Sequence, residues 1–207
     1  MADPPRPSAA YLVIGALSWP VLRLVFRLRA TGLEHVPRSG GCVLAANHLS
    51  NFDPWPLGMP LYPRRFLRFM GKSELFWFPL SVLLRAGGAF KVRRGQGDEE
   101  AMATAVELAR AGHVVVMFPE GTRRSKGLRK KHEARWRSGA ARIALEAGVP
   151  LVPAGISGTD RLSRFRLRVA YGPAIPTDGL GDDPVEAARA ATDLLREAIE
   201  GLEASLS

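Results

Sequence analysis

Apolar residues are arranged along the chain in two patterns, short continuous runs and longer stretches with helical spacing. The runs predict buried strands at 40–48, 64–71, 87–94, 113–118, 149–158 and 167–175. The helical pattern covers 98–110, 138–148 and 182–205, and the second of these stretches ends in glycine, a common helix terminator. Strands that alternate with helices predict one α/β domain with a mixed, mainly parallel sheet flanked by helices.

The N-terminal segment has a different pattern. Residues 9–22 form an uncharged apolar run, which is short for a membrane-spanning helix of about 20 residues, and arginines follow it. Arg23 and Arg27 are four positions apart, so a continuous helix would place them on one face. This pattern fits either an amphipathic helix lying in a membrane interface or a helix packed on the protein's own core. We expect residues 1–29 to form a tail and interfacial helix, and residues 30–207 to form the catalytic domain.

Composition and charge narrow the class of protein. The 207 residues are 46% hydrophobic and 24% charged, which is typical of a globular chain. The formal net charge of +9 predicts attraction to an anionic partner, such as nucleic acid, an anionic bilayer surface, or an acidic protein or substrate. A single cysteine, Cys42, excludes an internal disulfide, and its place inside a predicted strand indicates a buried, inert thiol.

The stretch AANHLSNFDPW, residues 45–55, carries the first candidate chemistry. His48 lies at the end of a predicted strand, and Asp53 directly precedes Pro54, which suits the first position of a helix. On one continuous helix the two side chains would be about 140° apart, but a strand-to-helix turn can bring them together. Asp53 is therefore either a helix N-cap, a partner of His48, or both, since a carboxylate has two oxygens.

Charged side chains also follow two other predicted strands. FPEGTRRS, residues 118–125, combines a carboxylate, a glycine, a hydroxyl and guanidinium groups, and VRR at 92–94 adds two more guanidinium groups. Guanidinium groups bind phosphate well, and ligands of α/β sheets bind beyond the strand ends. These side chains are either the lining of one crevice shared with His48 or solvated charges.

Several other chemistries lack their sequence signature. MGKS at 70–73 lacks the earlier glycine of a phosphate-binding loop, and no GxSxG elbow is present. The four histidines show no metal-ligand spacing. We therefore expect neither a metal nor a cofactor.

Taken together, the motifs resemble those of the lysophosphatidic acid acyltransferase family over roughly residues 30–175. NHLSNFD carries the family's NHx4D motif, GAFKVRR resembles its arginine block, FPEGTRRS matches its FPEGTRS block, and VPLVPAGI matches its Val-Pro block. KSELFWFPLSVLLRAGG matches the connector between the first two motifs. Two features depart from the pattern: Arg93 stands where the family often has Asp, and residues 123–137 are unusually basic.

The resemblance implies roles for individual residues. His48 would be the general base and Asp53 its orienting partner. The residues implied in acceptor-phosphate binding are Arg94, with Arg93 as its neighbour or alternative, and Glu120, Gly121, Thr122 and Arg123. Those implied in acyl-donor binding or motif support are Asn47, Pro119, Val149 and Pro150.

The implied reaction is acyl transfer from acyl-CoA or acyl-carrier protein to 1-acyl-glycerol-3-phosphate, which gives phosphatidic acid in phospholipid biosynthesis. The implied location is the cytoplasmic face of the cell membrane, with peripheral or monotopic attachment to an anionic surface. Another lyso-lipid, a glycolipid or an amine is the alternative acceptor. A basic nucleic-acid-binding module and a non-catalytic membrane-binding protein remain the alternatives from other classes, although the intact His48–Asp53 pair disfavours the latter and no nucleic-acid partner is expected.

Overall fold

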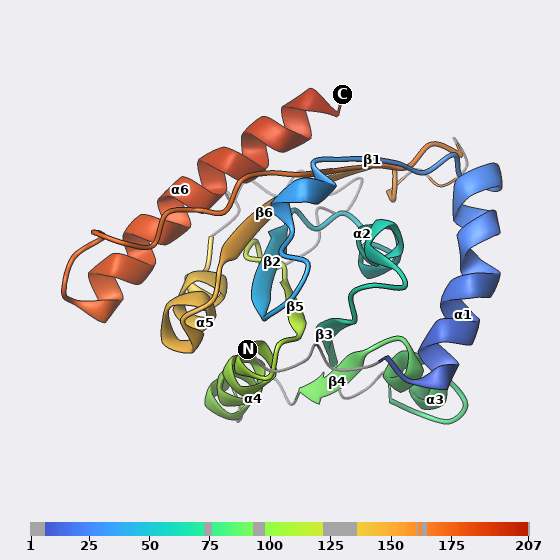
Figure 1. The fold of residues 1–207 in the computed structure, drawn as a ribbon, viewed down its shortest axis with the longest axis horizontal. Helices are drawn as coiled ribbons and strands as arrows, with labels where there is room; N and C mark the ends of the chain where they lie inside the picture. Colours follow the sequence, from blue (N-terminus) through green and yellow to red (C-terminus); the bar gives the residue numbers. More distant parts are fainter. Residues whose placement is uncertain are drawn as a thin grey trace.

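The structure is a computed structural model that describes residues 7–72, 76–92, 98–121, 136–160, 162 and 165–206. Its centre is a seven-stranded sheet in the order β1-β7-β6-β2-β5-β3-β4 (Figure 1). The strands are β1 Arg29–Thr31, β2 Cys42–Ala46, β3 Leu67–Lys72, β4 Ala89–Val92, β5 Val114–Met117, β6 Leu151–Ser157 and β7 Arg168–Tyr171. All neighbours are parallel except β6 and β7, so the predicted mixed, mainly parallel sheet is confirmed.

Helices cover both faces of this sheet (Figure 1). They are α1 Ala9–Pro20, α2 Pro54–Gly58, α3 Leu80–Ala86, α4 Asp98–Arg110, α5 Gly139–Ala147 and α6 Pro184–Ser205, with a π-helical turn η1 at Val21–Val25 and 3-10 turns η2 at Leu33–His35 and η3 at Met59–Leu61. The helices α4, α5 and α6 pack on one face, and η1, α2 and η3 contribute to the core on the other.

Strand β2 shows how the sequence builds these two cores. Val43 and Ala45 point into the core under α4, α5 and α6, whereas Cys42, Leu44 and Ala46 point into the opposite one. Successive side chains of a strand face opposite sides, so a strand buried on both faces needs a continuous apolar run. Every residue of β2 is buried, as the run at 40–48 predicts.

The N-terminal helix differs from the prediction at its end. Helical structure ends at Val25, and Arg27 adopts a left-handed backbone with φ of 49°, so Arg23 and Arg27 do not share a helical face. Arg23 instead donates from Nη1 to the Leu28 carbonyl at 3.0 Å, because the chain turns back toward β1. The buried Leu22 and Leu28 belong to the core of the domain.

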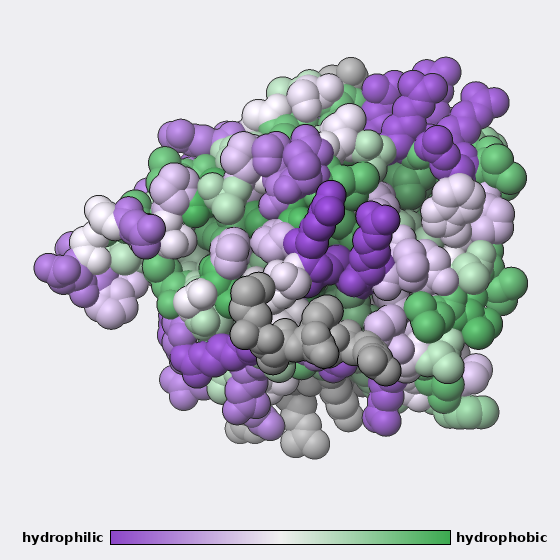
Figure 2. Space-filling model, in the orientation of Figure 1, coloured by the Kyte–Doolittle hydropathy of each residue, from purple (hydrophilic) through white to green (hydrophobic). Residues whose placement is uncertain are grey.

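The other side of the same segment is apolar and exposed. Large hydrophobic side chains are exposed along α1 and η1 and on the nearby stretch before and within α3: Leu12, Val13, Leu17, Trp19, Val21, Leu24, Val25, Trp77, Phe78 and Val82. We call this set the apolar flank. Figure 2 shows hydrophobic residues on the right-hand side of the molecule, where α1 runs in Figure 1. No helix in the described ranges is long and apolar enough to cross a bilayer.

Candidate active site

The candidate site lies at the carboxyl edge of three neighbouring parallel strands. His48 follows β2 by two residues, Glu120 follows β5 by three, and Thr159 follows β6 by two. Because β6, β2 and β5 are adjacent and parallel, the loops that leave them meet at one edge. This is where ligands bind in open α/β sheets.

His48 and Asp53 contact one another across the strand-to-helix turn, as their spacing allows. His48 Nδ1 lies 2.8 Å from Asp53 Oδ2; Asp53 is fully buried and the His48 side chain is 17% exposed. A carboxylate only accepts hydrogen bonds, so Nδ1 carries the proton and Nε2 of the neutral ring is left with its lone pair. The arrangement therefore presents a base at the edge of the sheet.

Asp53 lies at the N-cap position of α2, but its carboxylate points to the preceding turn instead of capping the helix. The residue already has helical dihedrals (φ −51°, ψ −40°), and its side chain makes no capping bond to α2. Its Oδ2 accepts instead from the backbone N–H groups of Leu49 and Ser50, at 2.7 and 2.9 Å. Asp53 and Pro54 therefore occupy the predicted N-cap and first helical positions, but the predicted capping bond from the Asp53 side chain is absent, because the carboxylate is turned over the preceding turn.

Thr159 holds the second oxygen of the same carboxylate. Its hydroxyl donates to Asp53 Oδ1 at 2.5 Å, and the threonine is itself buried. Sequence reasoning missed this residue, because it lies 106 positions from Asp53 and carries no motif. Only its position in the fold identifies Thr159, because it follows β6, the strand that pairs with β2.

Asn47 holds the ends of β2 and β6 together. Its side-chain amide donates to the Ile156 carbonyl at 2.9 Å and accepts from the Ile156 N–H at 2.7 Å. The residue is fully buried. These two bonds fix the relative position of the loops that carry His48 and Thr159, and a role of Asn47 in acyl-donor binding stays a prediction.

The segment after β5 contacts His48 from the other side. Glu120 is buried, and its Oε1 accepts from the His48 backbone N–H at 3.4 Å. The Phe118 ring stacks on the imidazole with a centroid distance of 4.2 Å and an interplanar angle of 19°. Phe118 was not predicted as a site residue, although it opens the FPEGTRRS motif, and its ring restricts the plane of the base.

Gly121 lies in a turn whose left-handed backbone favours glycine. Its φ is 69°, and a Cβ there would lie 2.8 Å from Nε of Arg137. The Arg137 backbone N–H donates to the Pro119 carbonyl at 2.9 Å, so the residue that ends the basic stretch returns to this turn. Arg137 is a neighbour of the site that the motifs did not identify.

Several predicted site residues are not brought to this edge or are not described. Val149 and Pro150 precede β6 and thus lie at its opposite end, where the Pro150 carbonyl accepts from the Val43 N–H at 2.9 Å. Pro150 thus contributes to strand pairing, whereas the Val149 N–H donates to the Ala144 carbonyl at the end of α5, at 3.0 Å. The predicted phosphate-binding residues Arg93, Arg94, Thr122 and Arg123 lie outside the described residues.

Cys42 faces the core at the far end of β2. It is fully buried, and burial raises the pKa of its thiol to about 11. A thiol held in its protonated form is a poor nucleophile, which agrees with the predicted inert residue. In the described part of the chain, no three His, Cys, Asp or Glu side chains gather into a metal site.

A histidine oriented by a buried carboxylate, at the carboxyl edge of a mixed α/β sheet, is the arrangement that general-base enzymes use. Comparison with known proteins identifies the family. The acyltransferase family model matches residues 27–157, so the chain belongs to the acyltransferase family and is an acyltransferase enzyme.

Individual relatives agree with this assignment. The 1-acyl-sn-glycerol-3-phosphate acyltransferase of Bacillus subtilis is 28% identical over 194 residues, which is 90% of this chain and 93% of the relative. The alpha enzyme of the same name from Bos taurus is 31% identical, over 78% of this chain and 58% of the relative. The crystal structure of the 1-acyl-sn-glycerophosphate acyltransferase of Thermotoga maritima superposes with a TM-score of 0.65 at 23% identity, covering 94% of this chain and 78% of that one, which establishes the shared fold.

Proposed function

We propose that this acyltransferase moves an acyl group from acyl-CoA or acyl-carrier protein to the free hydroxyl of 1-acyl-glycerol-3-phosphate, giving phosphatidic acid. The observation that carries the proposal is the His48–Asp53 pair, 2.8 Å apart and set beside Glu120 at the carboxyl edge. The names of the relatives from Bacillus subtilis and Bos taurus support the choice of acceptor.

His48 would act as the general base of a direct transfer. Its Nε2 takes the hydroxyl proton while the hydroxyl oxygen attacks the thioester carbonyl, and this type of assistance contributes about 10²–10⁴-fold. Asp53 stabilises the resulting imidazolium. A C–O bond forms, the C–S bond breaks, and the imidazolium returns the proton to the departing thiolate. No acyl-enzyme is required, because the thioester is already activated.

The acceptor phosphate would bind between the loops after β4 and β5. Both strands run parallel to β2, so the loops that leave them start at the His48 edge. Arg94, with Arg93 beside it, and Arg123 supply guanidinium groups suited to phosphate. Glu120 and the tight turn at Gly121 support this side of the acceptor site.

We also propose that the enzyme attaches to the cytoplasmic face of the cell membrane as a peripheral or monotopic protein. The apolar flank supports membrane attachment, because its large side chains are exposed, with Leu17 and Leu24 at 70% and 73%. An apolar surface of this kind, next to a chain of net charge +9, suits an anionic bilayer interface.

An acyl-transfer assay with a panel of lyso-lipid acceptors tests the reaction. The parent enzyme should acylate 1-acyl-glycerol-3-phosphate, and His48→Ala should lose about 10²–10⁴-fold in kcat. His35→Gln is the matched control, since it changes a histidine in η2, before β2, and should keep the parent rate. Equal activity of His48→Ala and the parent would refute the general-base mechanism. Activity only with acceptors that lack phosphate would refute 1-acyl-glycerol-3-phosphate as the acceptor. An acyl group trapped covalently on the enzyme would refute direct transfer.

Vesicle co-sedimentation tests the membrane proposal. Deleting residues 1–29 would also remove the core residues Leu22 and Leu28, so surface substitutions are the sharper choice. Leu17→Lys and Leu24→Lys together should reduce binding to anionic vesicles, because they place charge on the apolar flank. Val185→Lys, on the first turn of α6 at 74% exposure, is the control. Unchanged binding of the double variant would exclude the flank as the attachment surface.

A further inference from the structure

The amino edge of the sheet, opposite His48, carries a second cluster of functional groups. Strand pairing places Cys42 of β2 and Leu67 of β3 in one row with Val114 of β5. The residues that lead into these strands therefore meet at this edge, and they include Arg65 and His113. Each comes from a different connection of the fold, so sheet topology rather than local sequence assembles the cluster.

Arg65 is buried at the base of this cluster. It is 4% exposed, and its Nη2 donates to the Gly40 carbonyl. Its Nε and Nη1 are also buried, and neither has a hydrogen-bond partner in the part of the chain that the structure describes. A guanidinium group almost always pairs when it is buried, because desolvating an unpaired charge is strongly unfavourable.

Two further side chains of the cluster also have buried nitrogen atoms that lack hydrogen-bond partners among the described residues. These atoms are Arg68 Nε and His113 Nδ1. Both side chains lie against the ring of Phe66: the Arg68 guanidinium carbon is 5.5 Å from its centroid, and the His113 ring centroid is 5.8 Å from it. Arg68 and His113 are only partly buried as whole residues, so solvent reaches the cluster from their side.

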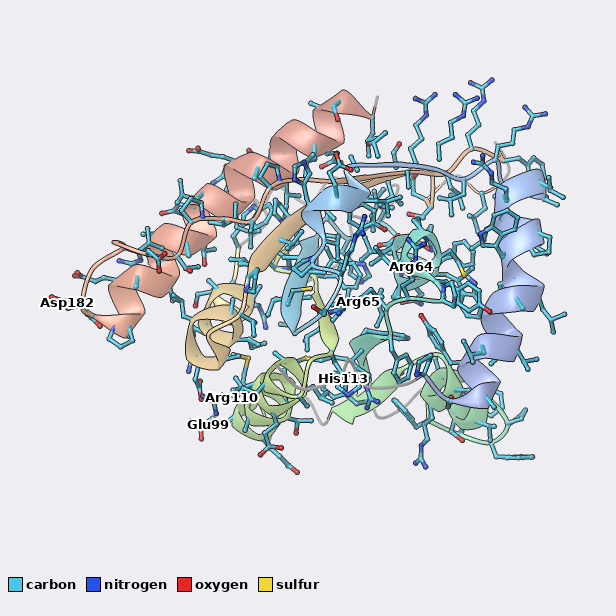
Figure 3. The ribbon with its side chains drawn as sticks, viewed as in Figure 1. Arg64, Arg65, Glu99, Arg110, His113 and Asp182 are labelled. Atoms are coloured by element: carbon cyan, nitrogen blue, oxygen red, sulfur yellow. The ribbon has the colours of Figure 1, made fainter. Side chains whose placement is uncertain are left out.

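No described group supplies the missing negative charge. Neither Arg65 nor Arg68 forms an ion pair with a carboxylate of the described residues. The nearby Cys42 thiol does not serve, because burial raises its pKa to about 11. Burial and the two arginines lower the pKa of His113 to about 4, as expected for a site that contains cations and no anion. Figure 3 shows Arg65 and His113 near the middle of the view, whereas the labelled acids Glu99 and Asp182 lie at its left-hand side.

We propose that Arg65, Arg68 and His113 form a phosphate-binding site at the amino edge of the sheet, separate from the catalytic edge. A phosphate group suits it because one compact anion offers several acceptor oxygens to donors that arrive from different elements. This proposal is independent of the proposed acyl-transfer reaction, because the phosphate site contains no residue of the His48 edge.

The phosphate comes either from a soluble anion or from a lipid headgroup, and one contact connects the site to the apolar flank. Tyr11 of α1 packs edge-on against Phe66 with centroids 4.5 Å apart, and its hydroxyl donates to the Arg65 carbonyl at 3.3 Å. The helix proposed to lie in the membrane interface therefore rests on the segment that carries the site. Both sources present the same chemical group to the cluster.

Histidine NMR of the full-length protein locates the bound anion directly. The probe is inorganic phosphate, with sodium chloride at matched ionic strength as the reference. His113 reports the amino edge and His48 reports the catalytic edge, so the two imidazole signals separate the sites. We expect phosphate to shift the His113 signals and, at about ten times its Kd, to raise Tm by about 3–6 °C.

Variants assign the shift to the cluster. Arg65→Met and, as a milder change on a partly exposed side chain, Arg68→Gln should each abolish the His113 response. Arg189→Met removes the same charge from the exposed side of α6 and should leave the response intact. If Arg65→Met fails to fold, Arg68→Gln still decides.

The outcomes separate the alternatives. A His113 response to inorganic phosphate supports the site with a soluble anion as its ligand. A His113 response to vesicles of phosphatidic acid, but not to vesicles of phosphatidylcholine, supports the site with a lipid headgroup as its ligand. A response of His48 alone would overturn the proposal, because phosphate would then bind only at the catalytic edge. No response at His113, or an equal response in Arg68→Gln, would also overturn it and leave internal water as the occupant of the cluster. Loss of acyl transfer in a separate assay would not bear on any of these results.

Discussion

Removing the Thr159 hydroxyl tests whether the catalytic carboxylate needs both of its oxygens held. Thr159→Val keeps the volume of the buried side chain but removes the donor that lies 2.5 Å from Asp53 Oδ1. Asp53 Oδ2 keeps its contacts with His48 Nδ1 and with the backbone N–H groups of Leu49 and Ser50. The carboxylate therefore stays in place but loses one of the groups that fix its rotation.

The size of the effect follows from burial. Both partners are buried, and a hydrogen bond to a charged group contributes about 1.5–3 kcal/mol, so the free energy of unfolding should fall by about that amount. If the poorer orientation of His48 raises the activation free energy of acyl transfer by about 1.4 kcal/mol, kcat falls about tenfold. KM should change little, because Thr159 is not expected to contact substrate.

The assay is steady-state acyl transfer together with chemical denaturation of each variant. Thr159→Ser restores the hydroxyl and should recover most of kcat. Thr192→Val is the matched control, because it removes a buried threonine hydroxyl that bonds the Ala188 carbonyl within α6 and should leave kcat unchanged. Parent values of kcat and stability in Thr159→Val, or a raised KM with an unchanged kcat, would refute this explanation of Asp53 positioning.

Three further predictions concern other parts of the molecule. Asn47→Ala leaves the buried N–H and C=O of Ile156 unpaired and should lower the free energy of unfolding by about 2–4 kcal/mol in urea titrations. Folding lowers the pKa of His113 from 6.5 to about 4, so the unfolded chain takes up the proton first. Stability should therefore fall as pH drops from about 6.5 to 4, by about 1–2 kcal/mol after allowance for solvent exposure, and His113→Gln should flatten that slope. Gly121→Ala should lower kcat/KM and stability more than Gly148→Ala, since both have positive φ but only the Cβ at 121 would overlap a neighbour.

Much of the fold follows from local patterns. The helix α4 occupies the predicted 98–110, and α5 ends at Gly148 in the left-handed conformation that glycine favours. The strand β1 was not predicted, because its three residues have no distinctive alternation and are paired with β7, more than a hundred residues later. The end of the N-terminal helix was also misplaced, since the reversal at Arg27 depends on contacts with the domain.

The candidate site also has parts that could be predicted from the sequence and parts that could not. The spacing of His48 and Asp53 and the strand-end position of Glu120 indicated one shared edge, while solvated charges stayed the alternative for Glu120. The direction of the Asp53 carboxylate was not predictable, because it depends on the backbone dihedrals of a single turn. Thr159 could be found only from the order of the strands in the sheet, which places it beside Asp53. Phe118 could be found only from the stacking of its ring on the His48 imidazole.

The reversed direction of β7 and β1 has a consequence for how the enzyme would meet its substrate. Because these two strands run opposite to the others, their first residues share an edge with the loop that carries His48. Phe26, which directly follows Val25 of the apolar flank, lies 6.1 Å from Phe52, centroid to centroid, so the chain leads from the apolar flank to the turn between His48 and Asp53. A lipid that diffuses in the bilayer plane would then reach His48 without crossing water. Turnover would depend on the mole fraction of acceptor in the surface rather than on its bulk concentration, and dilution with inert lipid would slow the enzyme even at constant total substrate.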